Sequence, residues 1–386
     1  MSRLFPDYTP AWETPEHKML RQVSGEFLAK EATPHQLRWM EQHKPDKEFW
    51  LKAGEAGILL TDAPVEYGGG GGDYGSEAVI TQELAFALDN AIGFEIHSTI
   101  TSHYIQAYAT HEQKLEWLPK MASGEMIGAI AMTEPDTGSD LQAVRTEAKR
   151  DGDWYVINGA KTWITNGTHM GMCVVVCKTD PTLGAKGISL IAVDCDKVEG
   201  LHRGKELMKI GQLGQDTREL FFDNVRVPAA NLLGGVEGKG FGQLMTQLAR
   251  ERLCIGVAAA AMAEAAVLET IRYVKERHIF GKPVLDFQNT RFVLAECKAD
   301  VLALKTMMDY CIGKAIDGTL DAPTASIAKM WGSDKVNVVL DKCLQLFGGY
   351  GYSMEYPIGQ MYAAARVERI YGGTNEVMKE LIGRTL

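Results

Sequence analysis

The chain has no long uncharged hydrophobic run and no recognisable leader. No apolar stretch approaches the ~18–20 residues that span a bilayer, and the first residues show no cationic segment followed by an apolar one. We therefore expect no membrane insertion and no signal peptide. The missing leader favours the bacterial cytoplasm over a processed mitochondrial-matrix protein.

Positive charge and paired cysteines are also scarce. The 40 basic residues are outnumbered by 50 acidic ones, giving a formal net charge of −10, which disfavours nucleic acid as a partner. Anionic small ligands stay possible, because local arginines and helix N-termini can hold phosphates. The seven cysteines include no Cys-x-x-Cys pair, and the nine histidines show no metal-ligand spacing. We expect buried thiols in a reducing compartment and no metal site.

What the sequence does contain divides into three regions of an α+β protein. Residues 1–125 have helical periodicity, residues 126–234 have short β-branched runs, and residues 235–386 return to long helices. Asp151-Gly152 predicts a hairpin, and Met172–Cys177 and Ile188–Val193 predict buried strands. The predicted helices are Glu16–Glu31, Lys47–Ala56, Ser76–Leu88, Ile100–Ala109, Glu112–Met121, Phe241–His278, Asp286–Asp317, Ala322–Leu346, Ile358–Tyr371 and Asn375–Arg384.

A glycine-rich segment at residues 70–75 satisfies the G-x-G-x-x-G pattern of dinucleotide-binding loops. That pattern requires a preceding strand, but the apolar run before it is short and is followed by Pro64. Asp73 would also place a carboxylate beside a pyrophosphate. We therefore favour a loop before a helix, with Ser76 as the N-cap.

Three polar segments could hold a ligand, and each also has a plain structural interpretation. The turn at residues 131–140 could line a heteroaromatic ring or a phosphate. Trp163, in the segment 158–167, could stack on a planar cofactor or belong to the core. The paired glycines at 372–373, before an expected Thr374 N-cap, could bind an anion or a carbonyl oxygen, or form a simple turn.

Glu251 stands on the apolar face of the long predicted helix. Leu248 and Ile255 are its neighbours at i−3 and i+4, and no lysine or arginine occupies i±3 or i±4. Such a carboxylate should have a raised pKa and is a candidate general base. The alternative is a partner on another helix, and the spacing alone leaves both interpretations open.

Five segments together resemble the acyl-CoA dehydrogenase flavoprotein family over essentially the whole chain. The segments are A-M-T-E-P-x-x-G-S-D at 131–140, N-G-x-K-x-W-I-T-N-G at 158–167, F-F-D-N-V-R-V-P at 221–228, E-R-H-I-F-G-K-P with F-Q at 276–288, and Q-L-F-G-G-Y-G-Y at 345–352. The resemblance implies an N-terminal helical domain, a central β domain and a C-terminal four-helix bundle, assembled as a homotetramer that is a dimer of dimers.

The same resemblance implies FAD as cofactor and an acyl-CoA as substrate. The positions matching FAD contacts are Met132, Thr133, Ser139, Trp163, Ile164, Thr165, Arg277, Phe280, Gln288, Gln345, Gly349, Thr374 and Glu376; the positions matching substrate contacts are Ser139, Arg252, Tyr371 and Gly372. The residues from Arg277 to Gly349 are expected to hold the ADP half of FAD, partly across a subunit interface. Electrons would pass to an electron-transferring flavoprotein.

One departure from the family pattern bears on the base. Most members carry the catalytic glutamate in Y-E-G-T, where this chain has Gly372. The long-chain and isovaleryl subgroups also lack that glutamate and place the base on the long helix, in a pattern that matches Glu251-Arg252. The resemblance therefore implies Glu251 as the acceptor of the α-proton, the Gly372 N–H as a donor to the thioester oxygen, and a long-chain or methyl-branched acyl group.

Two alternative functions remain. One is an acyl-CoA oxidase, or a dehydrogenase of a carrier-protein thioester, which would share the chemistry. The other is a non-catalytic scaffold or a nucleic-acid protection protein on the same fold. The net charge of −10 and the lack of a basic C-terminal run oppose the second alternative.

Overall fold

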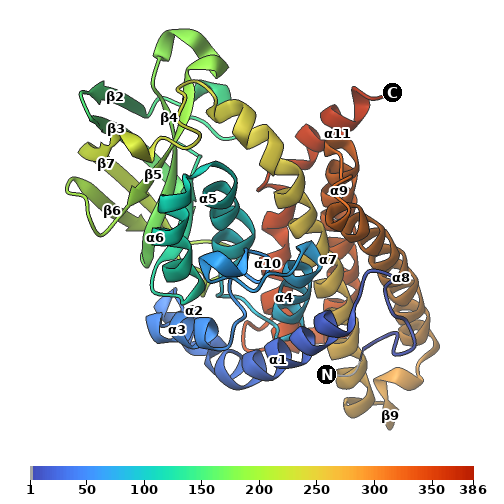
Figure 1. Cartoon of the computed structure of the whole chain (residues 1–386). Helices are drawn as coiled ribbons and strands as arrows, with labels where there is room; N and C mark the ends of the chain where they lie inside the picture. The colour runs from blue at the N-terminus through green and yellow to red at the C-terminus, as the bar shows by residue number, and fades with distance from the viewer. Residues whose placement is uncertain (1–2) are drawn as a thin grey trace.

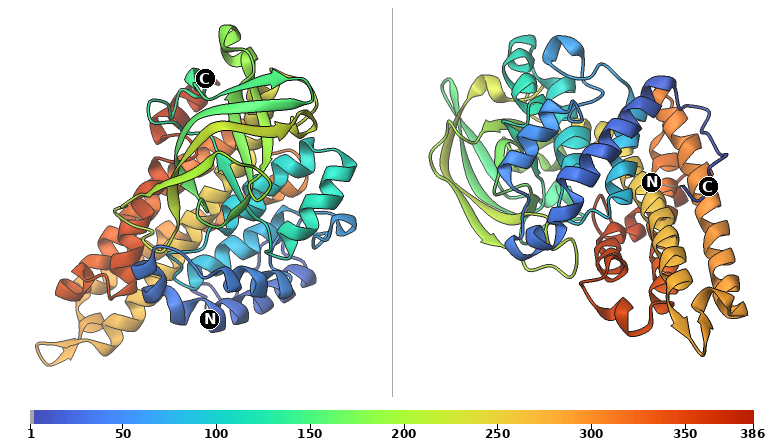
Figure 2. Two further views of the ribbon diagram at one scale, coloured as in Figure 1. Left: turned by 90° about the vertical axis from the view of Figure 1, so that its left-hand side faces the viewer. Right: turned by 90° about the horizontal axis from the view of Figure 1, so that it is seen from below.

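The computed structural model describes residues 3–386, and its elements follow the chain in three blocks of helices, strands and helices (Figure 1). Seen from below, the N-terminal helices lie between the sheet and the long C-terminal helices (Figure 2). Three buried apolar clusters hold these blocks together.

The first block consists of helices around one that is buried at all but one of its residues. Its longer elements are α1 (Pro15–Glu31), α2 (Gln36–Gln42), α3 (Lys47–Glu55), α4 (Tyr74–Phe86), the π-helix η3 (Glu95–Thr101), α5 (Ser102–Tyr108) and α6 (His111–Ala122), with 3₁₀ turns η1 (Thr33–His35) and η2 (Val65–Tyr67). Helix α4 packs against α1 on one side and α7 on another. It is therefore buried nearly all round, as its weak periodicity allows.

The predicted N-cap of α4 is wrong. Asp73, and not Ser76, caps the helix, and its side chain accepts from the Gly75 N–H at 2.7 Å. Aspartate is as good a cap as serine, and the glycines before it let the chain turn earlier than predicted. Asp73 also contacts the His17 ring at 3.0 Å, which ties the start of α4 to α1.

The second block is a seven-stranded sheet in the order β1-β4-β2-β3-β7-β6, with β5 paired to β4. The strands are β1 (Ile127–Ala131), β2 (Glu147–Asp151), β3 (Trp154–Thr165), β4 (Met170–Lys178), β5 (Ile188–Asp194), β6 (Leu201–Glu206) and β7 (Thr217–Pro228). The predicted hairpin joins β2 to β3, and the predicted buried strands are β4 and β5. Both predictions are confirmed.

The third block consists of α7 (Gly240–Glu276), α8 (Gln288–Ile316) and α9 (Ala322–Gln345) with the shorter α10 (Pro357–Ala365) and α11 (Asn375–Gly383). A small ribbon, β8 (His278–Ile279) with β9 (Lys282–Pro283), and the turns η7 (Val284–Asp286), η8 (Gly348–Tyr352) and η9 (Arg366–Arg369) connect them. The predicted helix 358–371 is wrong in its second half, because the chain tightens into the η9 turn after Ala365.

The expectation that no segment is long and apolar enough to cross a membrane is wrong for α7. One 18-residue window of α7 has a mean hydropathy of 1.7, but 67% of that window is buried inside the protein. Its alanine-rich faces pack against α8 and α9, as expected for the core helix of a bundle.

Candidate functional site

A cavity of about 880 Å³ opens where the sheet, the N-terminal helices and α7 meet. Its wall includes eleven of the residues singled out from the sequence, namely Met132, Thr133, Ser139, Trp163, Ile164, Thr165, Glu251, Arg252, Tyr371, Gly372 and Glu376. Residues more than 200 positions apart in the chain thus share one space. Apolar side chains of α4, η3 and α7, such as Leu84, Ile100 and Ile255, line much of the rest.

The end of β3 presents a large aromatic face to this cavity. Trp163 has a φ of 62°, a left-handed conformation within a strand whose pairing with β7 is interrupted between Lys161 and Ile164. The side chain is therefore turned out of the sheet and is 58% exposed. This exposure excludes the interpretation of Trp163 as a core residue. An uncovered indole on the same cavity wall as Thr133 and Thr165 is suited to a planar heteroaromatic cofactor.

A buried ion pair behind that face was missed in the sequence. Lys161 donates to Glu134 at 2.8 Å and to the Met132 carbonyl at 3.0 Å, and both side chains are almost wholly buried. The carboxylate also accepts backbone N–H groups of Arg145 and Thr146. These charge-assisted bonds hold the pKa of Glu134 below its usual value despite burial. The 131–140 turn is thereby fixed to β3.

Glu251 is buried on α7 and lines the cavity. Its partner does come from another helix, but that partner is neutral: the Tyr104 hydroxyl donates to Oε1 at 2.7 Å. Burial raises the pKa of Glu251 to about 7, against the lowering effects of Tyr104 and Arg252. Such a carboxyl group can take up or release a proton at neutral pH.

The glycine pair on the same cavity wall as Glu251 is a left-handed turn held by two side chains. Gly372 and Gly373 have φ values of 64° and 91°, which favour glycine. Arg252 donates to the Gly372 carbonyl at 3.3 Å, and the buried Lys329 donates to the Gly373 carbonyl at 2.8 Å. Thr374 caps α11, as predicted, by accepting from the Val377 N–H. The turn therefore has a fixed orientation at the cavity wall.

Two further carboxyl groups on the cavity wall were not found from the sequence. Burial raises the pKa of Glu95, on η3, to about 7 and that of Glu368, on η9, to about 8. Glu368 is buried, and its Oε2 has no hydrogen-bond partner within residues 3–386. At neutral pH Glu368 is largely protonated and Glu95 is about half protonated, so this part of the wall carries less negative charge than two ordinary carboxylates would.

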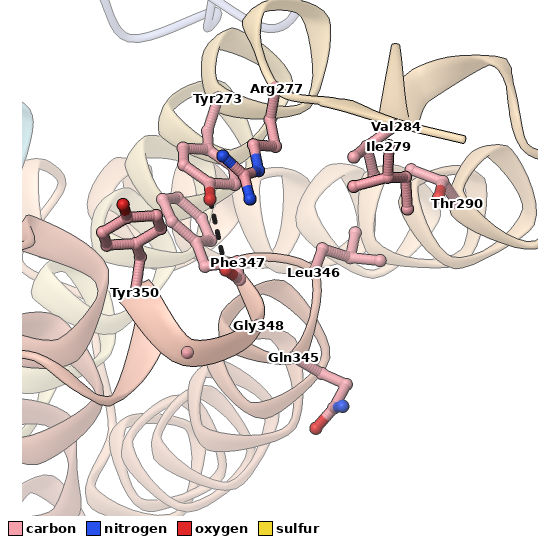
Figure 3. A pocket seen from close by; sticks show the side chains of 11 residues that line it. Tyr273, Arg277, Ile279, Val284, Thr290, Gln345, Leu346, Phe347, Gly348 and Tyr350 are labelled. Carbon is pink, nitrogen blue, oxygen red and sulfur yellow. Dashed lines mark hydrogen bonds between the residues drawn. The ribbon is translucent and has the colours of Figure 1, made fainter. Parts of the chain in front are cut away.

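The other predicted cofactor contacts lie elsewhere. Arg277, Gln345 and Gly349 line a separate hollow of about 630 Å³ at the far end of α7. Figure 3 shows the Arg277 guanidinium close to Tyr273 and Tyr350, whose rings form an open polar and aromatic surface. Phe280 (91% exposed), Gln288 and Thr374 line neither space. The single chain therefore divides the predicted FAD contacts between two places.

Comparisons with known proteins agree over nearly the whole chain. Family models described as acyl-CoA dehydrogenase N-terminal, middle and C-terminal domains match residues 14–125, 129–225 and 238–386. The chain is 43% identical to a mitochondrial long-chain specific acyl-CoA dehydrogenase of Sus scrofa over 373 residues, covering 96% of this chain and 86% of that protein. An acyl-CoA dehydrogenase structure from Geobacillus kaustophilus, also 43% identical, gives a TM-score of 0.94 over 98% of this chain and 99% of that one. A glutaryl-CoA dehydrogenase from Mycobacterium smegmatis in complex with FADH2 is 26% identical, with a TM-score of 0.89 and coverages of 97% and 95%.

Proposed function

The chain belongs to the acyl-CoA dehydrogenase family of FAD-dependent oxidoreductases, and from that premise we propose that it converts a long-chain or methyl-branched acyl-CoA to the trans-2-enoyl-CoA. The observation that carries the proposal is the buried Glu251 on the cavity wall, beside a glycine, Gly372, at the position where the resemblance puts the usual catalytic glutamate. The 43% identity to a protein named long-chain specific supports the acyl length.

Glu251 has the properties that α-proton removal requires. A general base is most effective when its pKa lies near the working pH, because it is then deprotonated and still basic. A pKa of about 7 meets that condition. Its location on a long packed helix keeps the carboxyl group aligned with a substrate in the cavity.

The turn at Gly372 is suited to receive the thioester oxygen. Negative charge develops on this oxygen as the α-proton leaves, and a preorganised N–H stabilises that charge. Within residues 3–386 the Gly372 N–H makes no hydrogen bond, while Arg252 fixes the carbonyl of the same residue. We propose that this N–H points at the substrate oxygen, and that Ser139 and Tyr371 contact other parts of the acyl-CoA.

FAD, when bound, supplies the acceptor for the β-hydride. Met132, Thr133, Trp163, Ile164 and Thr165 are proposed to surround its ring system, since they converge on the open indole face. Glu376, at the start of α11, lines the same cavity.

We also propose that the hollow at Arg277 serves the cofactor of a second copy in a homotetramer. The hollow lies at the far end of α7, away from the part of the cavity that contains Glu251. The proposal is supported by the family resemblance, which implies that the ADP half of FAD is held partly across a subunit interface. Arg277, Gln345 and Gly349 would contact the ADP half from the neighbouring subunit, with Phe280 and Gln288 close by.

The test replaces the base and then moves it. Glu251→Gln should slow anaerobic flavin bleaching by an acyl-CoA panel at least ~10²–10⁴-fold while acyl-CoA still binds. Adding Gly372→Glu should restore part of the rate, best with short straight chains. A side chain at residue 372 meets Ile255 Cδ1, 2.5 Å from the new Cβ, so Ile255→Ala belongs in the rescue variant. Wild-type bleaching by Glu251→Gln would refute the base.

A matched control is Glu264→Gln, which alters another buried carboxyl group on α7 outside the cavity. It should bleach at the wild-type rate.

Turnover with oxygen as the only acceptor would favour an oxidase, and reaction only with a carrier-protein thioester would favour that substrate instead. Faster turnover with an electron-transferring flavoprotein would support that partner, and a purified protein without FAD would favour a scaffold.

A further inference from the structure

Glu251 accepts one hydrogen bond within residues 3–386, and the donor lies on a different element. Tyr104, on α5, contacts Oε1 at 2.7 Å. The ring of Tyr104 is fully buried, and burial together with the neighbouring carboxylate raises the pKa of its phenol far above the ordinary value. Tyr104 therefore remains a protonated donor throughout the pH range in which an enzyme works.

The geometry points to Tyr104 as the positioning residue of the base, a role that rests on the function proposed above. Its hydroxyl holds Oε1 of Glu251 and leaves Oε2 as the oxygen that receives the α-proton. Glutamate has several rotatable bonds, and a base that moves by an ångström loses much of its rate. A hydrogen bond from a rigid, buried phenol removes part of that freedom. The sequence gives no sign of the contact, because the two residues are 147 positions apart.

The same hydrogen bond also affects the pH at which Glu251 becomes charged. A donor stabilises the carboxylate, so it lowers the pKa and opposes the effect of burial. The other titratable or charged groups on the cavity wall are Asp89, Glu95, Asp140, Arg252, Cys254, Glu368, Tyr371, Glu376, Glu380 and Arg384, and the neighbouring elements also carry His97 on η3, His103 and Tyr108 on α5, and Arg250 on α7. Of all these groups and Tyr104, only Tyr104 and Arg252 act on the Glu251 carboxyl. Arg252 also donates to the Gly372 carbonyl, whereas the Tyr104 hydroxyl has Glu251 as its one hydrogen-bond partner among the residues that the structure describes.

The experiment measures flavin bleaching by a long-chain acyl-CoA against pH in Tyr104→Phe. Loss of a hydrogen bond to a charged group corresponds to a pKa change of about one to two units. The acid limb of the pH–rate profile should move to higher pH by that amount. The reason is that Glu251 must be deprotonated to act as the base, and in Tyr104→Phe it loses its proton at a higher pH. At pH 7 the deprotonated fraction of Glu251, and with it the bleaching rate, should fall about 5- to 50-fold, while the acyl-CoA dissociation constant stays within about twofold.

Tyr108→Phe is the matched control. Tyr108 lies one turn further along α5, and its hydroxyl contacts the Gln243 carbonyl and the Gln247 amide, not Glu251. The acid limb of the pH–rate profile of Tyr108→Phe should coincide with that of the wild type. An upward shift of equal size in Tyr108→Phe would overturn the assignment, because the effect would then belong to α5 in general.

A double variant separates the positioning role from general damage. If Tyr104 acts through Glu251, adding Tyr104→Phe to Glu251→Gln should cost no further bleaching rate. An additional tenfold loss, or a wild-type acid limb in Tyr104→Phe, would overturn the inference while leaving the base in place. Activity in Glu251→Gln alone would instead overturn the proposed function. Should Tyr104→Phe lose FAD, Tyr104→Met must give the same upward shift, and a wild-type profile there refutes the inference.

Discussion

The buried pair of Lys161 and Glu134 should control both the stability of the sheet and the shape of the 131–140 turn at the cavity wall. Lys161→Met keeps the length of the side chain but removes the ammonium group, leaving the Glu134 carboxylate buried without its cation. Breaking a buried pair from one side costs about 3–5 kcal/mol. The loss should be near the upper end, because Lys161 also donates to the Met132 carbonyl and both side chains are almost fully enclosed.

Urea unfolding of the holoenzyme, followed by tryptophan and flavin fluorescence, measures this loss. Arg226→Met is the control, because it breaks an ion pair with Asp151 in the same sheet where both side chains are about half exposed or more. An exposed pair contributes only about 0–1 kcal/mol. Combining Lys161→Met with Glu134→Gln should cost less than the sum of the two single changes. A Lys161→Met loss no larger than that of Arg226→Met would refute the reasoning.

The remaining predictions concern the cofactor and pH. Trp163→Ala should weaken FAD binding at least ~10-fold in equilibrium dialysis, because the exposed indole face is lost; wild-type retention would exclude stacking. Arg277→Ala should release FAD at lower salt than the wild type, since a charge-assisted phosphate contact disappears, and an unchanged salt dependence would make Arg277 structural. Burial raises the pKa of Glu368 to about 8, so the wild type loses stability as pH rises from the unfolded-state pKa through 8. Glu368→Gln should therefore be more stable than the wild type at pH 9 and no more stable at pH 4, and equal melting temperatures at pH 9 would contradict this.

Local patterns predicted the elements well where one short-range rule decides the structure. Thr374 caps α11 because a threonine before a polar first turn satisfies the free N–H groups, and β4 and β5 are continuous apolar runs between turns. The rule failed where two residues compete, as with Asp73 and Ser76 at α4. It failed again after Ala365, where the chain changes from an α-helix to a 3₁₀ turn.

The site was predictable as a set of motifs but not as a set of contacts. The family resemblance pointed to Glu251 and Gly372 as candidates, because Glu251-Arg252 and Tyr371-Gly372-Gly373-Thr374 can be matched to family patterns. Tyr104 and Lys329 escaped notice because each acts on a residue far along the chain, where periodicity carries no information. The pKa values of Glu95 and Glu368 likewise depend mainly on burial in the folded protein, which the sequence around each residue does not indicate.

Helix α7 carries Glu251 in its first half and ends just before Arg277. The number of residues between them therefore fixes both the distance and the relative orientation of the cavity and the hollow. Each residue of a helix adds about 1.5 Å and turns the next side chain by about 100°. A one-residue deletion between these points would rotate Arg277 away from its hollow even though every contact residue remained present. An insertion of seven residues would nearly restore the facing but lengthen the spacing by about 10 Å. Substitutions at exposed positions of α7 would leave this spacing intact, whereas a change in its residue count would alter the relative orientation of its two ends.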